Sequence, residues 1–185
     1  MDMYWLLLNT NACSFAEIQK RQCIAIAWPE LGTLEKYIRE KPDWERQFKG
    51  YLQIRGDLAY GRESSWMNVD RHFDQVPDIF WQLLKIKKGD IVVAVESGNE
   101  LTFGRPVIRG IARINHDAIH HYQYNEKYHH AHSVCPKTTW FPWDNFTMGE
   151  LQMPHTNFRA LLADNEQIHQ VMEGWKVAAR KAKEK

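Results

Sequence analysis

Cysteine is scarce in this sequence, and the three cysteines follow no spacing that indicates a zinc ribbon or a disulfide framework. Cys13, Cys23 and Cys135 are odd in number and form no CxxC pair. We therefore expect reduced thiols and a cytoplasmic location. Long hydrophobic runs are lacking too, because no stretch reaches the roughly 18 apolar residues of a membrane span. The first residues lack the basic region and cleavage site of a signal peptide.

The sequence also lacks a charge surplus, since 24 basic residues oppose 23 acidic ones. This balance excludes a histone-like polybasic binder and leaves local basic patches open. Walker A, GxSxG, HExxH and paired DxD motifs are absent, and so is the PD-(D/E)xK spacing with its lysine. We therefore expect a protein without catalytic residues, bound metal or cofactor.

Aromatic residues, by contrast, are abundant, with eight Trp, seven Tyr and eight Phe. Such rings fill hydrophobic cores, but they also stack on nucleic-acid bases, at about 1–3 kcal/mol per base. Composition alone does not separate these uses. From their apolar neighbours we assign four of these residues to the core: Trp5, Phe80, Trp81 and Trp140.

Hydrophobic periodicity and capping signals predict a mixed α/β (α+β) fold. Ser14 and Glu17 have capping-box spacing, which opens a short helix. Residues 55–75 are polar and predict a surface loop. Strands are expected at 4–8, 23–28, 91–95, 107–114 and 132–140, and further helices from 33, at 43–52 and at 76–84.

The carboxyl-terminal part differs from the rest, because apolar residues from Phe158 to Trp175 recur at helical spacing. We expect a helical extension over 151–185 that packs on a domain formed by 1–150. Short strands mixed with helices favour a small curved or barrel-like mixed sheet surrounded by short helices.

Five motifs, taken in order, resemble the EVE domains of the PUA superfamily. They are CIAIAWPELGTL at 23–34, an aromatic-rich helix, KIKKGDIVVAVESG at 85–98, VIRGIARI at 107–114 and HSVCPKTTW at 132–140. The sequence is most similar to the amino-terminal DNA-reading domains of McrBC-type modification-dependent restriction systems. The related YTH domains read methylated adenine in RNA. The resemblance covers about three quarters of the chain and implies a PUA-like fold.

The resemblance implies an aromatic cage for a flipped base, with Trp28 at the end of its strand as one wall. Trp66, Tyr122 and Tyr124 are candidates for the opposite wall. Asn9 and Thr10 follow the first strand, where related domains place groups that hydrogen-bond to the base edge. A base is extruded only at a cost, so phosphate contacts are needed as well. The candidates for these contacts are Lys20, Arg21, Arg62, Arg71, Lys88 and Arg109.

The predicted function is that of a nucleic-acid reader that captures a modified base, methylated adenine or a modified cytosine, in DNA. A restriction or defence context is expected, with a nuclease or motor subunit as partner. Two alternatives remain open: an RNA-binding domain of this fold for modified RNA or tRNA, and a small ASCH-like RNA or modified-nucleoside hydrolase. The clustered residues His129, His130, His132 and Cys135 offer a transition-metal alternative, but no second cluster completes a ligand pattern.

Overall fold

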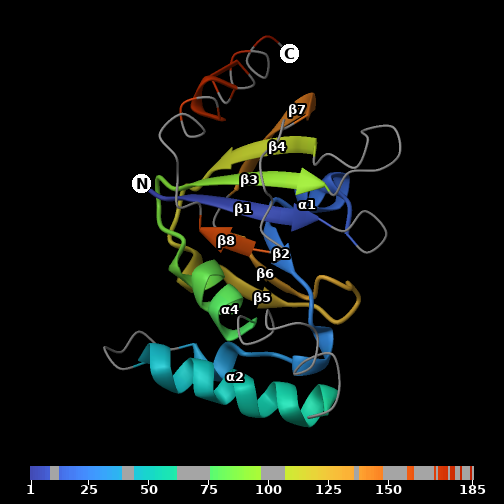
Figure 1. The fold of residues 1–185 in the computed structure, drawn as a ribbon, viewed down its shortest axis with the longest axis vertical. Coiled ribbons are helices and arrows are strands. Elements are labelled where there is room, and N and C mark those ends of the chain that lie inside the picture. Colours follow the sequence, from blue (N-terminus) through green and yellow to red (C-terminus); the bar gives the residue numbers. More distant parts are fainter. Residues whose placement is uncertain are drawn as a thin grey trace.

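The strands of this chain form two separate sheets (Figure 1). The structure is a computed structural model. It describes residues 1–8, 13–38, 44–61, 76–96, 107–135, 138–147, 158–160, 169, 171–174, 176–177, 180 and 184. Among these residues the strands do not close into a barrel. The mixed α/β class is confirmed, whereas the barrel-like closure expected from the sequence is not found.

The larger sheet has five strands in the order β7-β4-β3-β1-β8. The central strands β1 and β3 run parallel, and the other neighbours are antiparallel. Phe158 was expected to lie on a helix, but its backbone extends an edge of this sheet by pairing with β1. The strands are β1 (Met3–Leu8), β3 (Ile91–Glu96), β4 (Val107–Arg113), β7 (Thr139–Thr147) and β8 (Phe158–Ala160).

The smaller sheet has three antiparallel strands in the order β2-β6-β5. They are β2 (Ile24–Ile26), β5 (Tyr122–Tyr124) and β6 (His132–Val134). The single strand expected over 132–140 is therefore wrong. Residues 132–134 pair in the smaller sheet, whereas the chain from Thr139 onward pairs with β4 in the larger one.

The five-stranded sheet is buried on both faces, because all six residues of β3 are buried. Alternate side chains point to opposite faces of a strand. On β1, Leu6 accordingly joins the main core, whereas Trp5 joins a smaller cluster on the other face. Val171, from the carboxyl-terminal helical residues, packs in that smaller cluster.

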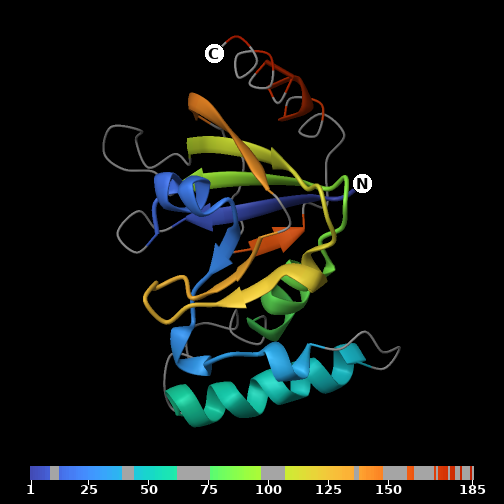
Figure 2. The same cartoon turned by 180° about the vertical axis from the view of Figure 1, so that it is seen from behind.

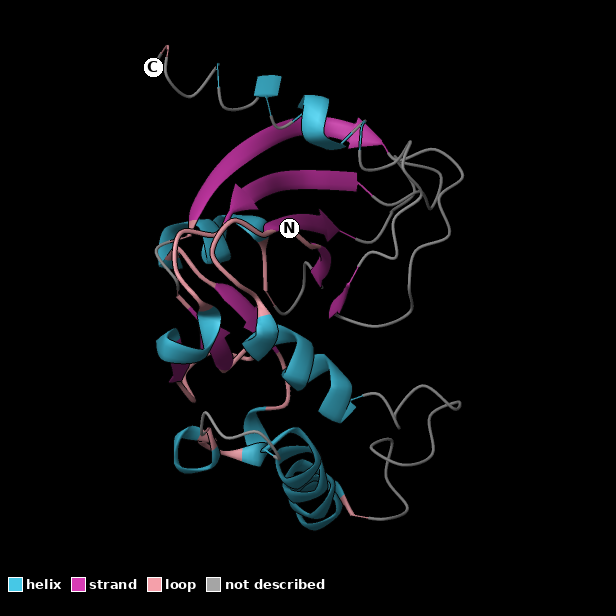
Figure 3. Cartoon of the chain, turned by 90° about the vertical axis from the view of Figure 1, so that its left-hand side faces the viewer, coloured by secondary structure: helices cyan, strands magenta, loops and turns pink. Residues whose placement is uncertain are grey.

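Helices flank the sheets on several sides (Figures 2 and 3). Ser14 caps the first of them by accepting a hydrogen bond from the Glu17 amide at 3.3 Å, as its sequence spacing predicts. α4 lies beside the smaller sheet, and α2 packs against α4 on the side away from the larger sheet (Figure 1). The α-helices are α1 (Phe15–Arg21), α2 (Trp44–Tyr60) and α4 (Val76–Lys85). The 3-10 turns are η1 (Pro29–Leu31), η2 (Glu35–Tyr37) and η5 (Ala118–His121).

Two helix predictions need correction. The loop expected from residue 55 is wrong for its first residues, because α2 continues to Tyr60 and buries Leu52 and Gly56. The helix expected from Thr33 is only the 3-10 turn η2, after which Ile38 is extended. None of the described helices has both the length and the apolar character that crossing a bilayer would require.

Candidate functional site

Trp28 has an unusual backbone conformation directly after β2. Its φ is 65° and its ψ is 53°, in the left-handed region. A bulky residue rarely adopts this conformation, which costs of order 1–3 kcal/mol and must be held by surrounding contacts. Pro29 then starts η1, so the chain turns sharply away from the sheet. The Trp28 ring is half-buried and packs at the edge of the main core.

His132 on β6 holds the Trp28 backbone in place. Its Nε2 atom lies 2.8 Å from the Trp28 carbonyl oxygen. A carbonyl only accepts, so Nε2 carries the proton and donates it, which leaves Nδ1 as an acceptor. The Tyr122 hydroxyl lies 2.7 Å from Nδ1 and donates to it, and Tyr122 in turn accepts from the Leu34 amide at 3.2 Å. This hydrogen-bonded chain connects β6, β5 and the segment after η1.

The chain of hydrogen bonds requires a neutral His132 imidazole. His132 is fully buried, and this burial lowers its pKa to about 4. Burial likewise raises the pKa of Tyr122, so its hydroxyl keeps the proton that it donates. At neutral pH every polar atom of the two side chains therefore has a partner.

Aromatic rings surround His132. The Phe80 ring meets it edge-on at 4.8 Å between centroids, and the Tyr124 ring lies at 5.1 Å. Phe80 also contacts Trp28, with centroids 5.7 Å apart. The Tyr124 hydroxyl donates to the Pro29 carbonyl at 2.8 Å. We call Trp28, Phe80, Tyr122, Tyr124 and His132 the Trp28 cluster.

Three of the six predicted cage residues thus lie around His132, although more than 90 positions separate the tryptophan from the two tyrosines: Trp28, Tyr122 and Tyr124. Tyr122 is committed to the hydrogen bonds with Leu34 and His132. Trp28 and Tyr124 are each half-buried. The remaining cage candidates, Asn9, Thr10 and Trp66, lie outside the described residues.

The predicted phosphate-binding residues have different surroundings. Lys20 and Lys88 are exposed and make no ion pair within the described part of the chain. Arg21 pairs with Glu17 at 2.9 Å, and its guanidinium lies 4.0 Å from the centre of the Tyr128 ring. Arg109 pairs with Glu96 across neighbouring strands. Arg62 and Arg71 lie outside the described residues.

The histidine-rich segment does not assemble a metal site within the described residues, where no three His, Cys, Asp or Glu side chains gather. His130 is buried, and this burial lowers its pKa to about 4. Its carbonyl accepts from Arg21 at 3.3 Å. His130 therefore packs inside the protein as a neutral side chain.

Sequence reasoning missed two members of the Trp28 cluster. His132 was weighed only as one of several clustered histidines, and Phe80 only as a core residue. One signal for His132 was present, because it opens an expected strand, and a polar ring that a strand buries needs hydrogen-bond partners. The partner of His132 is the main-chain carbonyl of Trp28, just after β2. A pattern of side chains in the sequence does not predict such a main-chain partner.

The described residues define the chain as a mixed α/β protein of two sheets with an aromatic cluster at the end of β2. Comparisons with protein-family models, curated proteins and solved structures found no match. The function is therefore argued from the geometry of the Trp28 cluster and from the sequence motifs.

Proposed function

We propose that this protein is a PUA-like, EVE/YTH-type nucleic-acid reader that captures a flipped, modified base of DNA against Trp28. The observation that carries the proposal is the left-handed backbone at Trp28, held by His132 from another strand. Strained backbone of this kind clusters at ligand-binding sites, where it fixes a side chain in position. The motif resemblance names the same tryptophan as a wall of the base cage.

The chemistry of a methylated base suits this position. Its π face stacks on an aromatic ring, and its methyl group gains apolar contact. Trp28 is only half-buried, and Tyr124 is half-buried beside η1, so neither residue is sealed inside the core. Methylated adenine and modified cytosine are the ligands that we propose.

Backbone phosphates would be held by basic residues of the same chain. Lys20 and Lys88 are the strongest candidates, because they are exposed and without ion pairs in the described part of the chain. Arg21 and Arg109 would have to exchange or share their glutamate partners. With a near-zero net charge, we expect moderate nonspecific binding that weakens with salt. A nuclease or motor subunit would act on the DNA that this reader marks.

Fluorescence polarisation with matched oligonucleotides tests the proposal. The panel holds unmodified, methyladenine, methylcytosine and hydroxymethylcytosine versions, each as DNA and as RNA. We expect tighter binding to one modified DNA, and Trp28→Ala should lose the preference while circular dichroism shows a preserved fold. A preference for RNA would support the reader of modified RNA instead. Equal binding to all oligonucleotides of the panel, unchanged by Trp28→Ala, would contradict the proposed base cage.

A further inference from the structure

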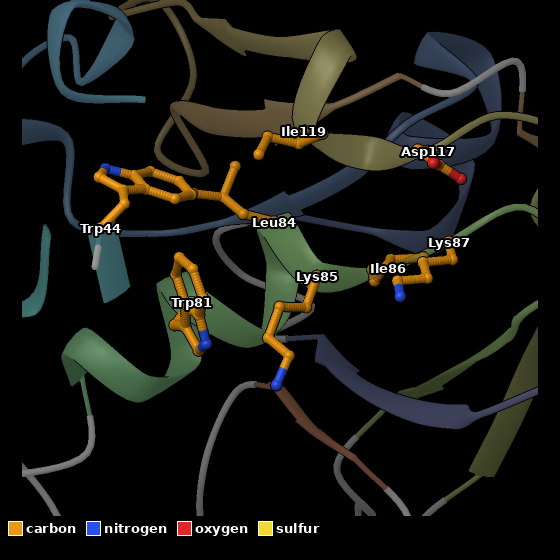
Figure 4. A pocket seen from close by; sticks show the side chains of 8 residues that line it. All are labelled: Trp44, Trp81, Leu84, Lys85, Ile86, Lys87, Asp117 and Ile119. Atoms are coloured by element: carbon orange, nitrogen blue, oxygen red, sulfur yellow. The ribbon is translucent and has the colours of Figure 1, made fainter. Parts of the chain in front are cut away.

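A pocket lies on a side of helix α4 that does not face the Trp28 cluster. Phe80 faces the Trp28 cluster, and the next residue, Trp81, points about 100° away, as helix geometry requires. Trp81 lines a pocket of about 200 Å³ between α2, α4 and η5 (Figure 4). We call it the tryptophan pocket. Its lining residues are Trp44, Trp81, Leu84, Lys85, Ile86, Lys87, Asp117 and Ile119.

One end of the tryptophan pocket is aromatic and fixed in shape. The rings of Trp44 and Trp81 meet at 4.8 Å between centroids, with planes 64° apart. The Trp44 indole nitrogen donates to the Tyr37 carbonyl, which fixes the orientation of that ring. Leu84 and Ile86, which also line the pocket, are buried. A planar apolar group would find preformed walls here.

Two exposed lysines also line the pocket. Lys85 lies at the aromatic end, with its Nζ atom 6.0 Å from the centre of the Trp81 ring, whereas Lys87 lies at the other end (Figure 4). Neither lysine forms an ion pair within the described part of the chain. The Asp117 carboxylate accepts from the Lys88 amide at 2.8 Å, so part of its hydrogen-bonding capacity is already used. Lys87 and Asp117 lie at the end away from Trp44 and Trp81 (Figure 4).

The wall formed by η5 is fastened to the end of α4. The Ala118 amide donates to the Ile86 carbonyl at 2.9 Å, and this bond joins η5 to the segment that follows the helix. Asp117 and Ile119 stand on either side of Ala118 and both line the pocket. The tryptophan pocket is therefore a preformed feature and not a gap between loose segments.

Size and chemistry together define the ligand. At about 30 Å³ per water in the liquid, the pocket has the volume of roughly six or seven waters, which is less than a drug-sized ligand fills. A single planar ring system fits this space. From these walls and charges we propose that the tryptophan pocket binds a nucleotide, with its base against Trp44 and Trp81 and its phosphate near Lys85 and Lys87. This site is separate from the Trp28 cluster and does not depend on the function proposed for that cluster.

Nuclear magnetic resonance of the indole N–H groups tests this proposal on the full chain. Trp44→Phe and Trp81→Phe assign the two signals. The probes are a nucleoside 5′-monophosphate, the matching nucleoside, inorganic phosphate, benzoate and a short unmodified oligonucleotide. We expect the monophosphate to shift both signals, and Lys85→Gln/Lys87→Gln to weaken its binding by about tenfold, because two charge-assisted contacts are lost. Lys127→Gln, an exposed lysine in the turn after β5, serves as the control and should change nothing.

Three results would overturn the nucleotide site. They are no shift of either indole signal at millimolar monophosphate, unchanged binding in Lys85→Gln/Lys87→Gln, and benzoate binding as tightly as the monophosphate. The oligonucleotide shows whether the nucleotide that binds in the pocket is free or is part of a strand. Tighter binding of the oligonucleotide assigns the pocket to one unit of a strand, and tighter binding of the monophosphate assigns it to a free nucleotide. Trp28→Ala should leave the shifts caused by the monophosphate unchanged, so a failure here is distinct from a failure of the base cage.

Discussion

The imidazole Nε2 of His132 lies 2.8 Å from the main-chain oxygen of Trp28, although 104 residues separate the two in the sequence. This bond ties β6 to the end of β2, where the backbone turns into a left-handed conformation. The ring that we propose as a base-stacking wall is therefore positioned by a buried histidine. The stability of the hydrogen-bonded chain through His132 is open to direct test.

Removing the Tyr122 hydroxyl should destabilise the fold. Tyr122→Phe leaves the buried Nδ1 of His132 without a donor and the Leu34 amide without an acceptor. A buried polar group left without its partner costs about 1–3 kcal/mol. Urea unfolding should show this loss in the free energy of unfolding. Tyr128→Phe keeps the ring under Arg21 and should cost less than about 0.5 kcal/mol. Equal losses in the two variants would contradict the role assigned to Tyr122.

The free energy of unfolding should already fall at a pH above the range in which carboxylates take up protons. Burial lowers the pKa of His130 and of His132 to about 4, whereas both take up protons near 6.5 in the unfolded chain. The unfolded state then binds more protons between these values, so stability falls as the pH drops from about 6.5 toward 4 and is constant above. At about pH 5 each histidine accounts for a loss of about 2 kcal/mol.

Urea unfolding at about pH 7.5 and about pH 5 measures this difference. His132→Asn cannot take up a proton, so its loss between the two conditions should be smaller than that of the wild-type protein. An identical free energy of unfolding at both conditions in the wild-type protein would show that neither histidine is held neutral.

A glycine on β4 should be intolerant of any side chain. A methyl group at Gly110 would overlap the ring of Phe15 on α1, which also packs edge-on against Trp140 at 5.7 Å. Gly110→Ala should therefore cost about 1–3 kcal/mol in thermal or urea unfolding. Phe15→Leu should recover part of this loss in the double variant. Gly50→Ala on α2 meets no atom within 4 Å and should stabilise the helix by about 0.5–1 kcal/mol. A neutral Gly110→Ala would contradict this packing of α1 on the sheet.

Cys135 should be the reactive thiol of the folded protein. A hydrogen bond from Cys23 lowers the pKa of Cys135 to about 7, and its side chain is partly exposed. Burial raises the pKa of Cys13 to about 12, and the pKa of Cys23 is raised by its bond to Cys135 and by burial. Iodoacetamide at about pH 7.5 should label one thiol per chain quickly, and Cys135→Ser should abolish this fast phase. Fast labelling of Cys13 or Cys23 in the native protein would contradict the assignment.

Helices and strands were predictable where the residues of one short segment determine them. The Ser14 cap, the buried strands at Tyr4 and Ile91 and the helix at Val76 depend on periodicity and capping within a few residues. The predictions failed where partners are distant. Phe158 pairs as a strand because β1 offers an edge, and the chain between Val134 and Thr139 changes sheets, which apolar periodicity does not reveal.

The candidate site was predictable only in part, for a similar reason. Trp28, Tyr122 and Tyr124 were singled out from the motifs, and the structure brings these three together. The left-handed backbone of Trp28 and its bond to His132 follow from tertiary contacts, so sequence alone did not reveal them. The tryptophan pocket also escaped prediction, because Trp44 and Trp81 come from different helices and look like ordinary core residues in the sequence.

The most direct test of the central claim is the ratio of affinities for a modified and the matching unmodified oligonucleotide, measured for wild type, Trp28→Phe and Trp28→Ala. Loss of one base-stacking wall is worth about 1–3 kcal/mol, or about 5- to 150-fold in affinity. We expect a clear preference in the wild type, a reduced one in Trp28→Phe and a ratio near one in a folded Trp28→Ala. The same ratio in all three proteins would contradict base capture at Trp28.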